Sequence, residues 1–324
     1  MINISLSALE LPPIEAGTWA EAALQHAAEV AGRLEGFGYN RIWYAEHHHS
    51  PSFGPFPPVV MTAHAAASTS FIRVGSGGVL VPNHSPIVLA EQFGTLASLH
   101  AGRIDLGIGR GPGTFDEATA QALRRGAGEM TSQQYRADVL AVLHFLTDEV
   151  SLRPLPEPWL LSSSTAGAVL AAEIGLPLTF AHHISPDNIS PALDVYRRDF
   201  SPSVWCRRPR VLICVEVVCA ETQGEADWLA SPMKVIKEGF LKGRGDIRFP
   251  TPEEASAHVF TSGEWQKLLS FYAQQACGPP ETVSRRLSEL AAATSADEIM
   301  LVTPISTLAD RLRSYELIGQ IIEK

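Results

Sequence analysis

The chain has 324 residues, of which 45% are hydrophobic and 19% charged, and its formal net charge is −10. The length allows one large α/β domain or two ordinary ones, and the composition is typical of a soluble globular protein. The acidic balance argues against a nucleic-acid-binding or anionic-membrane-binding protein. No signal-peptide pattern and no apolar run of about 18 residues is visible, so we expect a cytoplasmic protein.

Strand and helix patterns alternate along the chain. Ile2–Leu9 alternates apolar with small polar residues, which indicates a strand. Thr18 can cap a helix from Trp19 to about Glu35, and Gly36 and Gly38 can end it. Seven further strands are expected at Arg41–Ala45, Ile72–Pro82, Arg103–Ile108, Trp159–Ser162, Leu178–Ala181, Arg210–Ala220 and Glu298–Val302. Helical patterns lie between most of them.

Eight strands that alternate with helices predict a single (β/α)8 TIM barrel of the α/β class over residues 1–324. No change of composition marks a second domain. After the seventh strand comes a long insertion, in which Ser231–Ser262 mixes Lys, Gly, Pro and Phe and is expected to be irregular. Stretches of this length in a compact barrel are usually lids or disordered. We therefore predict a mobile lid at 231–262.

The Arg41–Ala45 strand ends directly in Glu46, His47, His48 and His49. In a barrel of parallel strands, that end forms the active-site face. Neighbouring histidines on a strand point to opposite faces, so they are poorly placed to share a zinc ion, and no metal is expected. Two interpretations remain open. The cluster either forms satisfied hydrogen bonds at a strand end, or it places one imidazole in the cavity for acid–base chemistry, with Glu46 orienting a ring.

Two features suggest a phosphate site. Arg110 stands between Gly109 and Gly111 after the fourth strand, and is either a surface arginine in a turn or a phosphate clamp. Ser162–Thr165 joins a strand to a helix start, and is either a plain cap or an anion-binding N-terminus. Together they would face one phosphate from two sides. The common nucleotide-binding motifs are absent, which leaves a phosphorylated cofactor of another kind.

Two further features at strand ends are less specific. Gly77-Gly78 is either a simple bend or a peptide that lets a flat ring lie against the backbone. His84, between Asn83 and Ser85, is expected to be a turn residue rather than a catalyst.

Three stretches resemble the bacterial luciferase-like flavin monooxygenases. They read EHH after an aromatic strand, RVGSGGVLVPNHSPIVLAEQFGTLASLHAGRIDLGIGRGPGT, and SSSTAGAVLAAEIGLPL. The similarity is strong over Trp19–Arg125 and fair over Trp159–Phe180 and Asp297–Val302. It implies a (β/α)8 barrel that binds FMN at the strand C-termini. It also implies a reaction in which reduced flavin and dioxygen oxygenate a small organic substrate.

The resemblance also implies roles for individual residues. His47 matches the family's catalytic histidine, and Arg110 matches its phosphate-binding arginine. Gly77-Gly78 matches a non-prolyl cis peptide that supports the flavin ring. The positions that match cofactor-binding residues are Gly77, Gly78, Arg110, Asp116, Ser163 and Ser164.

Departures from the true luciferases narrow this expectation. Gly109 replaces their cysteine, Ser163 their glutamate, and Ala181-His182 a Ser-Trp pair beside the flavin. Light emission is therefore not expected. No NAD fingerprint is visible, so reduced FMN would come from a separate flavin reductase, and a role in secondary metabolism and a homodimer stay open. The alternatives are a deazaflavin-dependent hydride-transfer enzyme and a non-catalytic flavin-binding subunit.

Overall fold

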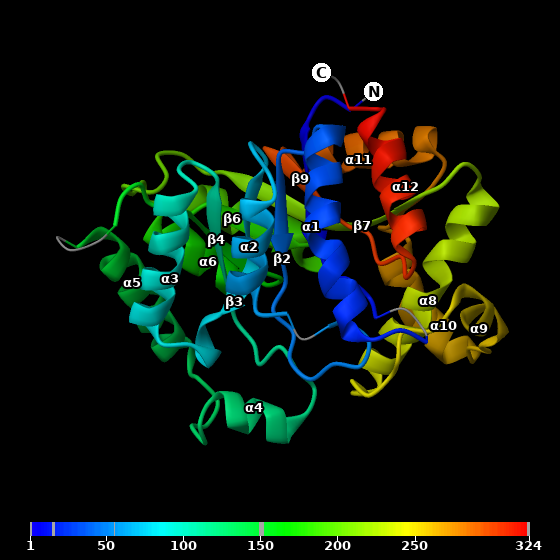
Figure 1. Cartoon of the computed structure of the whole chain (residues 1–324), viewed down its shortest axis with the longest axis horizontal. Coiled ribbons are helices and arrows are strands. Elements are labelled where there is room, and N and C mark those ends of the chain that lie inside the picture. Colours follow the sequence, from blue (N-terminus) through cyan, green and yellow to red (C-terminus); the bar gives the residue numbers. More distant parts are fainter. Residues whose placement is uncertain (1, 15–16, 55, 149–151, 323–324) are drawn as a thin grey trace.

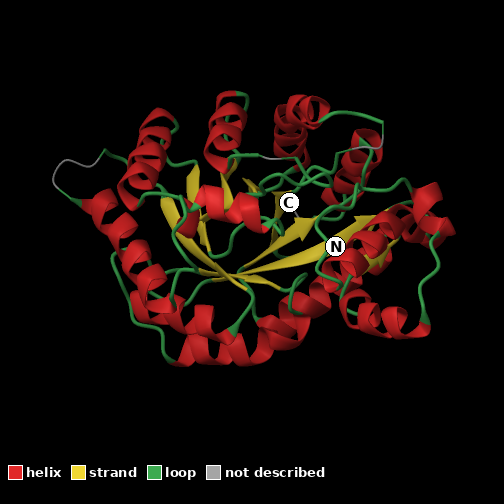
Figure 2. Ribbon diagram, turned by 90° about the horizontal axis from the view of Figure 1, so that it is seen from below, coloured by secondary structure: helices red, strands yellow, loops and turns green. Residues whose placement is uncertain are grey.

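The computed structural model describes residues 2–14, 17–54, 56–148 and 152–322. Its strands lie at the centre of the molecule and its helices around them (Figures 1 and 2). The strands are β1 (Ser5–Glu10), β2 (Arg41–Tyr44), β3 (Arg73–Leu80), β4 (Ile104–Gly109), β5 (Glu157–Ser162), β6 (Leu178–Ala181), β7 (Val211–Cys219), β8 (Ala276–Gly278) and β9 (Glu298–Val302).

Parallel pairing closes eight of these strands into a ring. The order is β6-β5-β4-β3-β2-β1-β9-β7, and β6 also pairs with β7. The predicted (β/α)8 barrel is therefore confirmed, with the expected eight strands as its wall. The ninth strand, β8, was not expected. Within the described residues it pairs with the end of β7, from Val217 to Cys219, beyond the part of β7 that pairs with β9.

Helices cover the outside of the barrel (Figure 2). They are α1 (Ala20–Phe37), α2 (Pro58–Ala67), α3 (Pro86–Leu99), α4 (Glu117–Leu123), α5 (Ser132–Thr147), α6 (Thr165–Ile174), α7 (Ile189–Arg198), α8 (Gln223–Leu241), α9 (Pro252–Ala257), α10 (Ser262–Tyr272), α11 (Pro280–Thr294) and α12 (Leu308–Gly319). Single 3-10 turns occupy Val81–Asn83 and Pro186–Asn188. None of the helices in the described part of the chain is long and apolar enough to cross a membrane.

The expectation that Ser231–Ser262 is irregular was wrong over 231–241, which belong to α8, and over 252–257, which form α9. Helix α8 continues through Pro232 to Leu241, because both parts of its buried face are packed. Leu229 and Ala230 cluster with Val218 of β7, and Ile236 clusters with Phe53 and Phe249. A proline inside a helix removes one hydrogen bond, and this apolar contact offsets the loss. Only 242–251 and 258–261 are non-helical in this stretch.

The barrel interior is closed at its amino-terminal end. Arg41, buried at the start of β2, lies 2.8 Å from Asp105 and 2.9 Å from Glu298. Above this ion network, an apolar plug fills the ring; it consists of Leu9, Trp43, Trp159, Leu212, Cys214, Met300 and Val302. Only the carboxyl ends of the strands are therefore left open to a ligand.

Candidate active site

A cavity of about 1800 Å³ opens at the carboxyl ends of the strands. The apolar plug forms part of its floor, and the loops after the strands form its walls. The residues predicted from the sequence all line it; they are His47, Gly77, Gly78, Arg110, Asp116, Ser163 and Ser164. The closed ring of parallel strands brings these positions together, although they lie far apart in the sequence.

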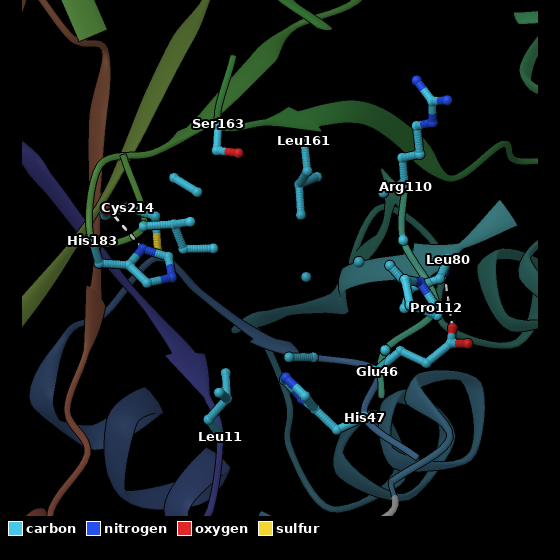
Figure 3. Close-up of a pocket in the computed structure, with 18 of the residues that line it drawn as sticks. Leu11, Glu46, His47, Leu80, Arg110, Pro112, Leu161, Ser163, His183 and Cys214 are labelled. Atoms are coloured by element: carbon cyan, nitrogen blue, oxygen red, sulfur yellow. Dashed lines mark hydrogen bonds between the residues drawn. The ribbon is translucent and has the colours of Figure 1, made fainter. Parts of the chain in front are cut away.

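His47 faces the cavity (Figure 3). Its ring is half-buried and packs 5.9 Å, centroid to centroid, from the ring of Phe53. Burial lowers the pKa of His47 to about 4, and the neighbouring His48 adds to this effect. The imidazole is therefore neutral at neutral pH, so it is suited to accept a proton rather than to act as a cationic acid.

Glu46 points away from His47, toward Leu80 (Figure 3). Its buried carboxylate accepts hydrogen bonds from the Leu80 N–H at 2.9 Å and from Asn83 Nδ2 at 3.1 Å. It also contacts Nε2 of His48 at 2.8 Å and Nε2 of His84 at 2.9 Å. Glu46 thus orients His48 and His84, not His47. His84, expected as a plain turn residue, is part of this network.

Burial by itself would raise the pKa of Glu46. The hydrogen bonds from His48 and His84 and from the Leu80 N–H outweigh it and lower the pKa of this carboxyl to about 2. Glu46 is therefore a stable anion that joins the loop after β2 to the turn after β3. His47 lies in the chain between Glu46 and His48. These two neighbours contact each other through their side chains, and the His48 N–H also donates to the Gly113 carbonyl, so the backbone on both sides of His47 is held in place.

The Gly77-Gly78 peptide on β3 is cis, as the resemblance implied. A Cβ atom on Gly78 would lie 2.7 Å from the Gly107 carbonyl oxygen, and one on Gly77 would clash with Leu9 Cδ1. Side chains cannot be accommodated there without displacement of β4 or of the plug. The backbone therefore forms a flat patch of cavity wall without side chains.

Arg110 and the start of α6 lie on either side of Leu161 in Figure 3. The Arg110 guanidinium donates to Ser132 Oγ at 3.1 Å and to the Met130 carbonyl at 3.0 Å, which leaves further N–H donors for a ligand. Ser164 caps α6 by accepting from the Gly167 N–H at 3.3 Å, while Ser163 points its hydroxyl into the cavity. This set of donors fits a phosphate group.

Asp116 lies at the exposed rim of the cavity. It caps the short helix α4, and its Oδ2 accepts from the Thr119 N–H at 2.8 Å. The hydrogen bonds from the Thr119 hydroxyl and N–H lower the pKa of Asp116. Its observed contacts are those of a helix cap, and its carboxylate stays ionised at the rim.

Residues 8–298 match the family model described as luciferase-like monooxygenase. The chain belongs to the luciferase-like monooxygenase family. It is 35% identical to a luciferase-like monooxygenase of Escherichia coli K12, over 99% of this chain and 98% of that protein. The solved structure of apo-MsnO8 is 32% identical, with a TM-score of 0.88 and 98% of each chain covered. The expectation of a flavin-dependent monooxygenase is confirmed at the level of this family.

More distant structures share the fold of this luciferase-like monooxygenase. One is the oxygenating constituent of 3,6-diketocamphane monooxygenase from Pseudomonas putida, in complex with FMN, at 19% identity and a TM-score of 0.71 over 98% of this chain and 97% of that one. Another is an F420-dependent secondary alcohol dehydrogenase, at 12% identity and a TM-score of 0.71 over 99% and 98%. At these identities the likeness concerns the barrel alone.

Sequence reasoning missed a second polar group in the cavity of the luciferase-like monooxygenase. Glu216 on β7 and Lys237 on α8 line the cavity and form an ion pair at 2.6 Å. His183 also lines it, whereas its neighbour His182 does not. A glutamate inside the apolar run 211–219 was a visible signal for a buried partner. Lys237 was not recognised as that partner, because the sequence of its segment was interpreted as irregular rather than helical.

Proposed function

We propose that this protein is an FMN-dependent monooxygenase that takes reduced flavin from a separate reductase and oxygenates a small organic substrate. The observation that carries the proposal is the placement of phosphate donors, a bare backbone wall and a neutral histidine in one cavity. Its volume of about 1800 Å³ exceeds the roughly 300–1,000 Å³ of an ordinary ligand pocket. A cofactor and a second molecule can be bound together.

Two groups of residues in the cavity would bind two different parts of the cofactor, its phosphate and its flavin ring. Arg110, Ser163 and Ser164 would hold the phosphate, because a guanidinium and a helix N-terminus both favour an anion. The wall at Gly77-Gly78 would hold the flat ring against the backbone. When bound, reduced FMN supplies the electrons that activate dioxygen. The protein orients the flavin and the substrate and supplies a group that accepts and returns a proton.

His47 moves a proton in this proposal. Its imidazole is neutral when the cavity is empty, so its free ring nitrogen accepts a proton from the reacting molecules and later returns it. Glu46 does not contact the His47 ring. Its effect is indirect, because it holds His48 and the loop that carries His47. We therefore assign His47 as the catalytic residue and Glu46 as a positioning residue.

The segment after α8 would exclude water during the reaction. Gly243, Arg244, Gly245 and Asp246 line the cavity at its mouth. Ser52, in the loop after β2, donates its hydroxyl to the Ile247 carbonyl, so this segment already contacts the loop that carries His47. Closure of such a segment protects reactive species from water. The lid proposed for 231–262 is thereby narrowed to its non-helical part at 242–251.

Three titrations separate this function from hydride transfer with a deazaflavin. The full chain is titrated with FMN, with reduced FMN under exclusion of oxygen, and with F420, with binding followed by fluorescence. Reduced FMN should bind most tightly. Tight binding of F420 with no binding of either form of FMN would overturn the proposal in favour of the deazaflavin enzyme. If neither cofactor binds, the flavin assignment itself is wrong.

A further inference from the structure

Glu216, Lys237 and Gln275 form a buried polar cluster at one wall of the cavity. Glu216 Oε2 lies 2.6 Å from Lys237 Nζ, and Glu216 Oε1 accepts from Gln275 Nε2 at 2.7 Å. All three residues are buried. On β7, Glu216 shares its face with Cys214, and both line the cavity. The cluster is therefore built into the barrel wall and not attached to the surface.

The cluster has donors to offer but no net charge. An ammonium group has three N–H donors, and Glu216 is the one carboxylate partner that the described residues give to Lys237. The rings of Phe271 and Tyr272 lie 5.4 and 5.2 Å from Nζ and supply no acceptor atoms on their faces. Lys237 can donate to a ligand, while Glu216 already neutralises the charge that would attract an anion.

His183 offers a hydrogen-bond acceptor, where Lys237 offers a donor. Its Nδ1 lies 3.1 Å from the Cys214 carbonyl oxygen, which can only accept, so Nδ1 carries the proton of the neutral ring. Burial lowers the pKa of His183 to about 4, and the charge of Lys237 acts in the same direction. Nε2 therefore keeps a free lone pair. The ring points into the cavity in Figure 3, on the side of Leu161 that faces away from Arg110.

Much of the remaining cavity lining is apolar. Leu11, Met233, Phe240, Phe271 and Met300 belong to it, and the Phe271 ring lies beside Lys237 Nζ. A ligand that reaches His183 and Lys237 therefore buries mostly carbon surface, and its polar part must match one donor and one acceptor. A neutral hydroxyl group does so, because its oxygen accepts one hydrogen bond and donates another. A carboxylate cannot donate to His183 Nε2.

We propose that His183 and Lys237 form a subsite for the hydroxyl group of an otherwise apolar, aromatic or alicyclic substrate. The hydroxyl oxygen accepts from Lys237 Nζ and donates its hydrogen to His183 Nε2. The inference rests on the proposed function only in calling this ligand the substrate. Recognition itself requires neither flavin nor dioxygen, so it can be tested on the empty protein.

The test compares three bicyclic probes that differ only in their polar group. Binding of 1-naphthol, naphthalene and 1-naphthoate to the full chain is measured by equilibrium dialysis without flavin. We expect 1-naphthol to bind about tenfold more tightly than either of the others, because it gains a hydrogen bond from the Lys237 ammonium and donates one to the neutral His183 ring. Equal binding of naphthol and naphthalene would overturn the proposal. Tighter binding of naphthoate would show an anion site instead.

Three variants locate the effect. His183→Asn keeps an N–H for the Cys214 carbonyl but removes the Nε2 acceptor, and it leaves the ion pair intact. Lys237→Met combined with Glu216→Gln removes the donor without leaving a buried charge unpaired. Lys267→Met, on the exposed side of α10, is the matched control. The first two should reduce the naphthol preference to within about twofold of naphthalene, and the control should keep it.

The outcomes separate the two proposals. A full naphthol preference in His183→Asn overturns the subsite, even if the double variant does not fold. FMN binding is measured on the same samples. Normal FMN binding without a naphthol preference removes the subsite and leaves the proposed function. A naphthol preference that depends on His183, in a protein that binds no flavin, keeps the subsite and removes the monooxygenase assignment.

Discussion

The carboxylate of Glu46 lies 2.9 Å from Nε2 of His84, although the two residues follow different strands. The contact joins the loop after β2 to the turn after β3. Together with the bond from the Leu80 N–H, it holds the segment that carries His47 against the neighbouring strand. The acid beside the candidate catalytic histidine is thus a structural anchor of the cavity rim.

Replacing Glu46 should be costly to stability. Glu46→Ala leaves the Leu80 N–H without its acceptor and removes one of the two acceptors of Asn83 Nδ2. We expect a loss of roughly 2–4 kcal/mol in the free energy of unfolding. Urea unfolding measures it. The control is Glu289→Ala, which breaks an exposed pair with Arg285 and should cost less than about 0.5 kcal/mol. Similar losses in both variants would contradict the anchoring role.

Arg110→Ala should weaken FMN binding through the phosphate alone. A hydrogen bond to a charged group contributes about 1.5–3 kcal/mol, so affinity should fall about ten- to a hundredfold. Riboflavin, which lacks the phosphate, should bind both proteins equally. Arg136→Ala is the control, because Arg136 also lines the cavity but pairs with Glu173. Equal losses for FMN and riboflavin in a fluorescence titration would show that Arg110 is not the phosphate clamp.

His47→Ala should lose substrate oxygenation and keep the cofactor. General acid–base groups contribute about 10²–10⁴-fold, and we expect a loss of that order with FMN affinity changed by less than about fivefold. Dioxygen should still be consumed and released as hydrogen peroxide. His48→Ala is the matched control and should act through stability, since His48 contacts Glu46. A His47→Ala enzyme that forms product at the normal yield per dioxygen would remove His47 from the mechanism.

The protein should lose stability in mild acid. Burial lowers the pKa values of His47, His182 and His183 to about 4 each, whereas an unfolded histidine titrates near 6.5. Between these values the unfolded chain binds more protons, so the free energy of unfolding decreases as the pH falls from about 6.5 to 4. Each histidine contributes at most about 1.4 kcal/mol per pH unit.

Urea unfolding at pH 7, 6 and 5 measures this slope. His182→Gln should reduce it, because one buried imidazole no longer titrates. His144→Gln, on the exposed face of α5, is the comparison variant. A free energy of unfolding that stays constant from pH 7 to 5 would contradict the assignment of these histidines as neutral buried groups.

The segment 242–251 should be the first site of tryptic cleavage. It offers Lys242, Arg244 and Arg248 between two helices, and its main anchor is Phe249, whose ring lies 5.7 Å from that of Phe53. FMN together with 1-naphthol should slow cleavage. Phe249→Ala should accelerate it, and Val259→Ala, on the exposed side of the same insertion, should not. Initial cleavage elsewhere in the empty protein would contradict a lid at this place.

The sequence by itself determined the barrel and the face that carries the site. Alternating strand and helix patterns, with stops such as Gly175 at φ 68°, are local properties, and eight such units have one common closed arrangement. Once the strands are parallel, residues that follow strand ends must meet at one rim. For that reason the order of residues along the chain is enough to place His47, Gly78, Arg110 and Ser163 in one cavity.

Only the tertiary structure decided which side chains pair across that rim. Glu46 turns to His84 rather than to His47, and Glu216 meets Lys237 from a helix that the local pattern had read as irregular. His183, and not His182, reaches the cavity. These outcomes depend on how neighbouring loops and α8 pack once the ring is closed. The neutral state of His47 has the same origin, because a pKa shift by burial depends on every segment that excludes water from the ring.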